Sequence, residues 1–206
     1  GIVGADGPTH QGAFDLSFLR CVPNMVLLAP SNESECRDML YTAFLYNGPA
    51  AVRYPRGSGP GEVESKEMRA IPIGKGVVKQ SGSRVALLAF GTMVNPVLAA
   101  GVELDATVVN MRSVKPLDNE LILEMAKSHE IVVSIEENTI RGGAGAGIAE
   151  VLSAAGCTTQ FLILGLPDHH VDQGETGPVL SDLGLDAAGI VASVRKRMAL
   201  KTPASH

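Results

Sequence analysis

The chain has 206 residues, of which 45% are hydrophobic and 19% charged, a composition typical of one large globular domain or two modest ones. Its formal net charge at pH 7 is -5, and its isoelectric point is near 5.5. Because no basic run is longer than residues 195–197, we expect no nucleic acid partner, and a small anionic substrate would need locally placed arginines.

Cysteine spacing and the length of apolar runs indicate a cellular location. Cys21, Cys36 and Cys157 form no CxxC pair, so they indicate neither a disulfide framework nor a zinc site. No stretch approaches the roughly 18 apolar residues that a membrane-spanning helix needs. We therefore expect a cytoplasmic protein without a membrane partner.

The first residues resemble the interior of a domain. The chain begins without Met, and residues 1–3 indicate a strand that leads directly into a glycine-rich loop. Terminal segments are usually dispensable or frayed. We therefore expect that sequence is missing upstream of Gly1.

A strand–helix–strand unit is predicted in the N-terminal quarter. Residues 25–28 form a short apolar run typical of a buried strand, and residues 50–54 form the next strand. Ser31 or Asn32 can cap the helix between them, with Glu35 completing a capping box. Such a βαβ unit implies parallel strands. The apolar residues that recur with the period of an amphipathic helix are Cys36, Met39, Leu40, Ala43 and Phe44.

A linker and a second α/β domain follow. Residues 58–70 lose periodicity and gain glycine, proline and charge, so we expect domains at 1–57 and 71–206. Asp118 and Asp186 are each placed to cap a helix. Residues 201–206 are expected to be disordered. The apolar runs predicted to be strands of a mostly parallel sheet are 85–90, 107–110, 131–135 and 161–164.

The loop Gly4–Gly12, with the sequence GADGPTHQG, carries the first candidate functional residues. Three glycines and a proline turn the chain while presenting Asp6, Thr9, His10 and Gln11. An imidazole can transfer protons, and a carboxylate can accept hydrogen bonds from substrate hydroxyls. Equally, these side chains can satisfy backbone groups of a tight turn. The loop alone leaves both interpretations open.

Ordered motifs along nearly the whole chain resemble the thiamine-diphosphate-dependent transketolase superfamily. They are DGPTHQ, LRCVPNM, PSNESECRDML, AVRYPRG, IGKGVVK, NMRSVKPLD, IEENTIRGGAGAGI, GLPD and LGLDAAGI. The segment GAFDLSFLR resembles the branch that condenses pyruvate with glyceraldehyde 3-phosphate more than transketolase itself. The resemblance implies that 1–57 is the C-terminal part of a pyrimidine-binding domain and 71–206 a transketolase C-terminal domain.

The resemblance assigns roles to residues on the substrate side. It implies that Asp6 and His10 are catalytic and contact the acceptor aldehyde, with His10 a candidate for proton transfer. Arg56 resembles the family's arginine that binds the acceptor phosphate, a task that suits a planar guanidinium. Arg53, three positions earlier, should point to the opposite face of a strand and form a structural ion pair.

The resemblance also implies thiamine diphosphate and Mg²⁺ as cofactors, bound mainly by regions absent from this chain. The family's magnesium motif and its catalytic glutamate have no counterpart here. We therefore expect no cofactor-binding and no metal-binding residue in the chain, and no glutamate is nominated for catalysis. We also expect the fragment alone to be inactive.

Three other signals favour structural explanations. The glycine run 142–147 follows Glu136 and Glu137, whose charges would repel a pyrophosphate, so a dinucleotide site is disfavoured. We expect this loop to be structural or near subunit contacts. Residues 168–172 contain metal-ligand types, but adjacent side chains diverge. His129 is most simply a favourable charge at a helix C-terminus.

Three functions remain open at this point. The first is the pyruvate–glyceraldehyde 3-phosphate transferase, a homodimer when complete, which starts the non-mevalonate isoprenoid route and supplies thiamine and pyridoxal precursors. The second is a transketolase or a 2-oxo acid dehydrogenase β subunit. The third is an inactive dimerisation or binding module.

Overall fold

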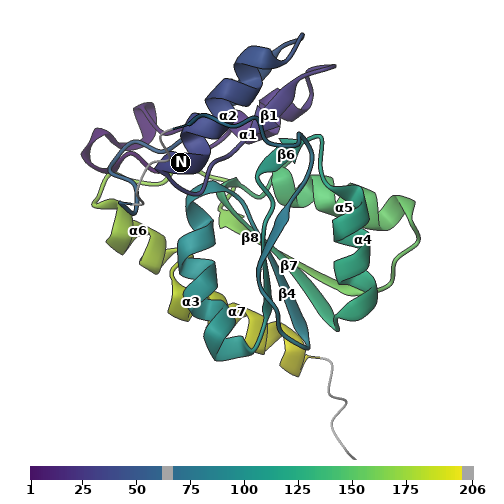
Figure 1. The fold of residues 1–206 in the computed structure, drawn as a ribbon. Coiled ribbons are helices and arrows are strands. Elements are labelled where there is room, and N and C mark those ends of the chain that lie inside the picture. Colours follow the sequence, from purple (N-terminus) through teal and green to yellow (C-terminus); the bar gives the residue numbers. More distant parts are fainter. Residues whose placement is uncertain (62–66, 201–206) are drawn as a thin grey trace, which may run out of the picture.

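The computed structural model describes residues 1–61 and 67–200, and its strands within those residues form two sheets (Figure 1). The larger sheet consists of Val77–Gln80 (β3), Val85–Ala89 (β4), Thr107–Asn110 (β5), Ile131–Thr139 (β7) and Gln160–Leu166 (β8). Its order is β3-β5-β4-β7-β8, and all pairs are parallel except β3 with β5. The predicted mostly parallel sheet is confirmed, and β3 is an antiparallel addition.

Side chains of the central strand β4 alternate between two hydrophobic cores. Val85, Leu87 and Ala89 face one core, whereas Ala86 and Leu88 face the other. Because successive side chains of a strand point to opposite faces, a sheet covered on both sides has apolar residues at every position. The first face is covered by Val94–Leu104 (α3) and Ala187–Ala199 (α7), and the second by Asn119–Ser128 (α4) and Ala144–Ala154 (α5) (Figure 1).

The predicted helix caps are confirmed. The carboxylate of Asp118 accepts a hydrogen bond from the backbone N–H of Leu121 at 3.3 Å, and that of Asp186 accepts one from Gly189 at 2.7 Å. These bonds satisfy amides that have no partner inside the helix.

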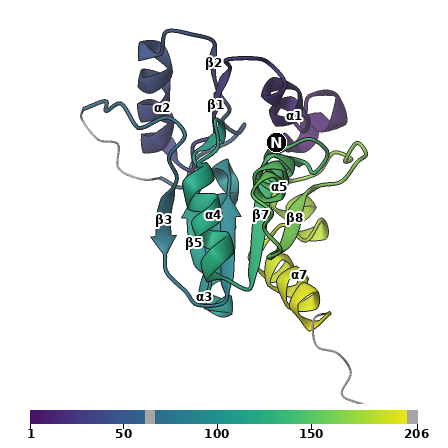
Figure 2. The same cartoon turned by 90° about the vertical axis from the view of Figure 1, so that its right-hand side faces the viewer.

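The N-terminal segment lies at one end of the larger sheet (Figure 2). Its elements are a 3₁₀ helix at Gly4–Thr9 (η1), then Asp15–Arg20 (α1), Val26–Leu28 (β1), Glu33–Leu45 (α2) and Ala50–Val52 (β2). Strands β1 and β2 are parallel, which confirms the βαβ unit. On its other edge β1 pairs antiparallel with Ser113–Lys115 (β6), from beyond the predicted linker. The two predicted domains thus share a sheet, and their boundaries stay a prediction.

Two predictions about the N-terminal segment are wrong. Residues 1–3 are not a strand, because the N–H of Ile2 donates to Glu137 Oε1 at 2.7 Å instead of to a neighbouring strand. Helix α2 begins with the predicted cap, since Asn32 Oδ1 accepts the Glu35 N–H at 2.8 Å. Its predicted apolar face is not buried as a whole, however: Leu40 is 50% and Phe44 85% exposed.

The side of α2 that is buried carries polar residues beside Met39. The carboxylate of Glu35 accepts hydrogen bonds from the backbone and hydroxyl of Ser31, from Asn110 and from Arg112. Burial raises the pKa of Glu35, but these donors outweigh burial and the pKa is lowered from its usual value. These bonds compensate for desolvation of the carboxylate. Because charged residues are usually exposed, the residue type alone did not predict that Glu35 is buried.

The segment 176–199 is the one part of the described chain that passes a test for a membrane helix by length and composition. This is weak evidence, because the segment consists of two helices, Thr176–Asp182 (α6) and α7, and core helices pass the same test. Ile190, Val191 and Val194 of α7 are buried in the core. The predicted disordered end, 201–206, and residues 62–66 of the predicted linker lie outside the described residues.

Candidate functional site

The GADGPTHQG loop forms η1 with its tip exposed. Gly7 adopts φ 66° and ψ -160°, a conformation that side chains rarely adopt, and it separates the two turns of η1. Asp6 precedes this kink and His10 follows it, so both project from the same exposed tip. The glycines and the proline were predicted to turn the chain while presenting polar side chains, and Asp6, Thr9 and His10 are exposed.

A segment from the end of the chain supports the loop from behind. The Gln11 amide donates to Val171 O at 3.0 Å, and the Gly174 N–H donates to Gly4 O at 3.3 Å. The ring of His170 lies edge-on to Phe14, with centroids 5.5 Å apart. The histidine- and aspartate-rich segment 168–172 therefore packs near the loop. Within the described residues, no three His, Cys, Asp or Glu side chains converge as metal ligands.

The structure brings Arg56 and Asp6 together. Arg56 follows β2 by four residues, and its guanidinium forms an ion pair with the Asp6 carboxylate. Both side chains are substantially solvent-exposed, so the pair is an open one that a competing ligand can displace. The residues that flank Arg56 line a cavity of about 340 Å³ between the start of α2 and Thr92.

Arg53 forms the predicted ion pair, with its Nε 3.1 Å from Asp15 Oδ2. The expectation that it points away from the face of Arg56 stays a prediction, because β2 ends at Val52 and regular strand alternation is not established for residues 53–56. Both arginines contact the N-terminal segment. Arg53 Nη2 donates to Gly12 O at 2.9 Å, at the end of the loop that carries Asp6.

His10 stands at the exposed end of η1. Its Nδ1 lies 2.9 Å from Thr9 Oγ1, and within the described residues this is the one hydrogen-bond partner of the ring. The ring is therefore held at one nitrogen, and the second nitrogen is directed elsewhere. This arrangement suits proton transfer to a ligand at the loop tip.

The glycine run 142–147 has a structural role at the start of α5. The buried carboxylate of Glu136 accepts hydrogen bonds from the N–H groups of Ala144 at 2.7 Å and Gly145 at 2.8 Å. These are the amides that would otherwise bind a phosphate at this helix start. A Cβ at Gly143 would lie 2.7 Å from the backbone oxygen of Thr139, so close packing also requires glycine there. His129 likewise ends α4, with Nδ1 3.0 Å from Met125 O.

The class of the protein follows from the α/β fold together with two family matches. Residues 74–190, more than half of the chain, match the family described as "Transketolase, C-terminal domain", and residues 1–61 match "Transketolase, pyrimidine binding domain". The chain therefore belongs to the transketolase family, as the motifs predicted.

Among curated relatives, the chain is similar to 1-deoxy-D-xylulose-5-phosphate synthases. It is 58% identical to that of Nitrosomonas europaea over 97% of the chain and 33% of the relative. It is 59% identical to that of Chromobacterium violaceum over 97% of the chain and 32% of the relative. The chain thus spans about a third of the length of the curated relatives it matches.

Two solved structures have a similar fold. A protein titled "Split gene transketolase, inactive beta4 tetramer" is 34% identical, with a TM-score of 0.82 over 95% of this chain and 64% of that one. Transketolase from Campylobacter jejuni is 19% identical, with a TM-score of 0.67 over 94% of this chain and 29% of that one, a likeness of fold alone.

Proposed function

We propose that this chain is the acceptor-binding, C-terminal part of a 1-deoxy-D-xylulose-5-phosphate synthase. The complete enzyme would be a thiamine-diphosphate-dependent transferase that condenses pyruvate with glyceraldehyde 3-phosphate and releases carbon dioxide. It would serve the non-mevalonate isoprenoid route and supply thiamine and pyridoxal precursors, as a cytoplasmic homodimer. The identity of 55–59% to synthases of this name supports the proposal.

The observation that carries the proposal is the ion pair between Asp6 and Arg56. It joins two segments that lie about 50 positions apart in the sequence, and it places a cation beside a hydrogen-bond acceptor at an open surface. A phosphate group can replace the carboxylate on the guanidinium, because arginine forms bidentate hydrogen bonds with either group. The acceptor phosphate would then release Asp6 to accept a hydrogen bond from the acceptor's hydroxyl.

His10 is proposed as the group that exchanges a proton with the acceptor carbonyl oxygen. It lies four residues after Asp6 at the same exposed tip, and only one of its ring nitrogens is engaged within the described residues. An imidazole can both donate and accept a proton, so it can serve an oxygen that gains or loses charge during the reaction.

In the complete enzyme, the cofactor would be bound mainly by regions outside this chain. Thiamine diphosphate stabilises a carbanion and so makes carbon–carbon bond formation possible. Within the described residues no group of three His, Cys, Asp or Glu side chains could hold a metal ion. The roles proposed for Asp6, His10 and Arg56 concern the acceptor alone. The expectation that this chain contains no cofactor-binding residue stays a prediction.

The exposed apolar side of α2 is consistent with a chain that contacts further polypeptide. Leu40, Phe44 and Leu45 are each at least half exposed, and contiguous apolar groups of this kind mark interaction sites. This supports the proposed homodimer of the complete enzyme, but it equally fits the alternative of an inactive dimerisation module.

Substrate assays on the complete protein distinguish the alternatives. With thiamine diphosphate, Mg²⁺, pyruvate and glyceraldehyde 3-phosphate, we expect deoxyxylulose phosphate and carbon dioxide in equal amounts. Transfer from a ketose phosphate donor in place of pyruvate would instead indicate a transketolase. Acyl transfer to a lipoyl group would indicate a 2-oxo acid dehydrogenase β subunit, and no turnover with any donor would favour the binding module.

A further inference from the structure

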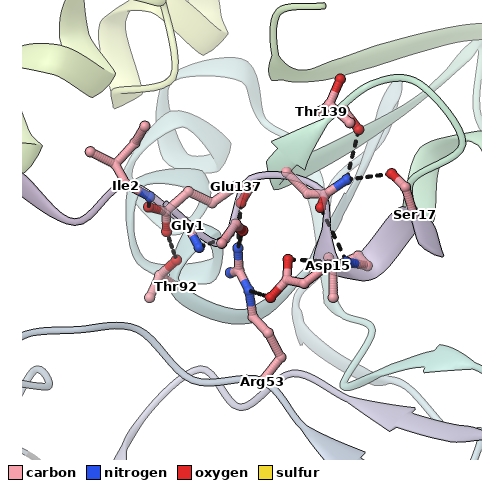
Figure 3. A network of polar contacts seen from close by, with 11 residues as sticks. Gly1, Ile2, Asp15, Ser17, Arg53, Thr92, Glu137 and Thr139 are labelled. Atoms are coloured by element: carbon pink, nitrogen blue, oxygen red, sulfur yellow. Dashed lines mark hydrogen bonds and ion pairs between the residues drawn. The ribbon is translucent and has the colours of Figure 1, made fainter. Parts of the chain in front are cut away.

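The guanidinium of Arg53 binds three separate segments of the chain at once. Its Nε donates to Asp15 Oδ2 at 3.1 Å, in α1, and its Nη2 donates to Gly12 O at 2.9 Å, at the end of the loop. The same Nη2 donates to Glu137 O at 2.6 Å, in β7. The Arg53 side chain is only 9% exposed, and Figure 3 shows its guanidinium beside Asp15 and Glu137.

The strand end of β7 fixes both ends of the loop. Before the loop, the Ile2 N–H donates to Glu137 Oε1 at 2.7 Å, while Thr92 Oγ1 donates to the other carboxylate oxygen at 2.6 Å. After the loop, the Thr139 N–H donates to Ala13 O at 2.7 Å. The tip between these anchors carries Asp6 and His10, so its position depends on the anchors.

Arg53 also fixes the segment that carries Arg56. Its backbone N–H donates to Leu28 O at 2.8 Å and so continues the parallel pairing of β1 with β2. Only two residues separate Arg53 from Arg56. One buried side chain therefore connects the loop with Asp6 to the segment with Arg56, at a point where both are tied to β7.

A lysine cannot reproduce this arrangement. A guanidinium offers donors in a planar fork, so it can bind acceptors in different directions in one fixed geometry, whereas an ammonium is a point charge on a flexible stem. Substitution by lysine keeps the positive charge beside Asp15 but gives up the simultaneous contacts to Gly12 and Glu137.

We propose that Arg53 is a positioning residue that holds the Asp6–His10 tip and Arg56 in register for the phosphorylated acceptor. It does not touch the substrate. This role rests on the function proposed above, because register matters only if both segments bind one ligand. Misplacement of a binding group by about 1 Å can cost up to about 100-fold in rate.

The first test measures the loop in this chain without any substrate. In Arg53→Lys, amide hydrogen exchange of peptides that cover residues 4–12 should be about tenfold faster or more, because the loop loses a charged hydrogen bond at its end. Arg20→Lys is the matched control. Arg20 is 15% exposed and also bridges segments, from α1 to Gly142 and Glu150, but it does not contact the loop.

The second test uses the complete enzyme. In Arg53→Lys, kcat/KM for glyceraldehyde 3-phosphate should fall about 10- to 100-fold with the KM for pyruvate unchanged, whereas Arg20→Lys should leave both near wild type. Both variants should lower the unfolding midpoint similarly, which separates positioning from general stability. The proposal is overturned if loop exchange matches wild type, or if acceptor kcat/KM falls no further than in Arg20→Lys. A wild-type enzyme without synthase activity would reject the proposed function, and the exchange result would still decide whether Arg53 holds the loop.

Discussion

Glu136 makes the stability of this chain depend on pH. Burial raises its pKa to about 7 from 4.5, against the opposing effects of the Gly145 and Ala144 amides and of the Arg20 and Arg53 charges. Between these values the folded chain holds a proton that the unfolded chain has released. The contribution to stability is therefore fully present below pH 4.5 and is lost as the pH rises through 7.

The size of the effect follows from the shift. At about 1.4 kcal/mol per pH unit, a displacement from 4.5 to about 7 corresponds to about 3 kcal/mol. Glu136→Gln stays uncharged at every pH and has nearly the same volume. The difference in unfolding free energy between wild type and Glu136→Gln should therefore change by about 2 kcal/mol or more between pH 5 and 8.5, to the disadvantage of wild type at high pH.

Urea unfolding followed by circular dichroism measures this difference. Other titrating groups are common to both proteins, so their contributions cancel in the comparison. The altered hydrogen bonding of the glutamine amide to α5 adds an offset that does not vary with pH. Parallel stability curves for the two proteins would refute the raised pKa and indicate that the α5 amides keep Glu136 ionised throughout.

Four further outcomes are expected. Arg56→Ala in the complete enzyme should raise the KM for glyceraldehyde 3-phosphate about 10-fold or more through loss of a charged hydrogen bond, with pyruvate as the internal control; an unchanged acceptor KM would remove Arg56 from the phosphate role. His10→Ala should lower kcat about 100-fold or more while cofactor binding by calorimetry is retained, and full activity would return His10 to a structural role. The 206-residue chain alone should neither bind thiamine diphosphate tightly nor make product, so micromolar binding would contradict this expectation. Asp186→Ala should lower the unfolding free energy by about 1 kcal/mol through loss of the α7 cap, and urea unfolding at an unchanged midpoint would contradict it.

Elements of the fold were predictable where a local sequence pattern matches the burial or the hydrogen bonds that the structure shows. Strands β4, β5 and β7 are buried and β8 is partly buried, and each contains a mostly apolar run. Asp118 and Asp186 cap helices through their own local amides. Strand β6 was not predictable, because its three residues pair with β1 at a distance of about 85 positions. The orientation of α2 was also missed, since its buried Glu35 depends on Asn110 and Arg112, which no local pattern reveals.

The sequence motifs nominated the residues of the candidate site but not their arrangement. The motifs pointed to Asp6, His10 and Arg56, but nothing in the sequence placed Arg56 against Asp6. Glu137 was read only as a charge that disfavours a pyrophosphate. The signal that could have identified Glu137 is a carboxylate just after an apolar run that is predicted to be a strand. Such a group needs hydrogen-bond donors if it is buried, and here they are Ile2 and Thr92.

The pairing of β1 with β6 joins the N-terminal part to the rest of the chain independently of the segment that connects them in the sequence. Hydrogen bonds, a shared core and the ion pair of Glu35 with Arg112 hold the N-terminal part to the rest of the chain. A backbone break within residues 58–70 should therefore leave the two pieces associated, and two separately expressed polypeptides covering 1–61 and 67–206 should reassemble when mixed. The covalent link across this stretch then serves mainly to keep the two pieces at a high effective concentration. If the gene were split there, the two encoded chains should still form nearly the same fold.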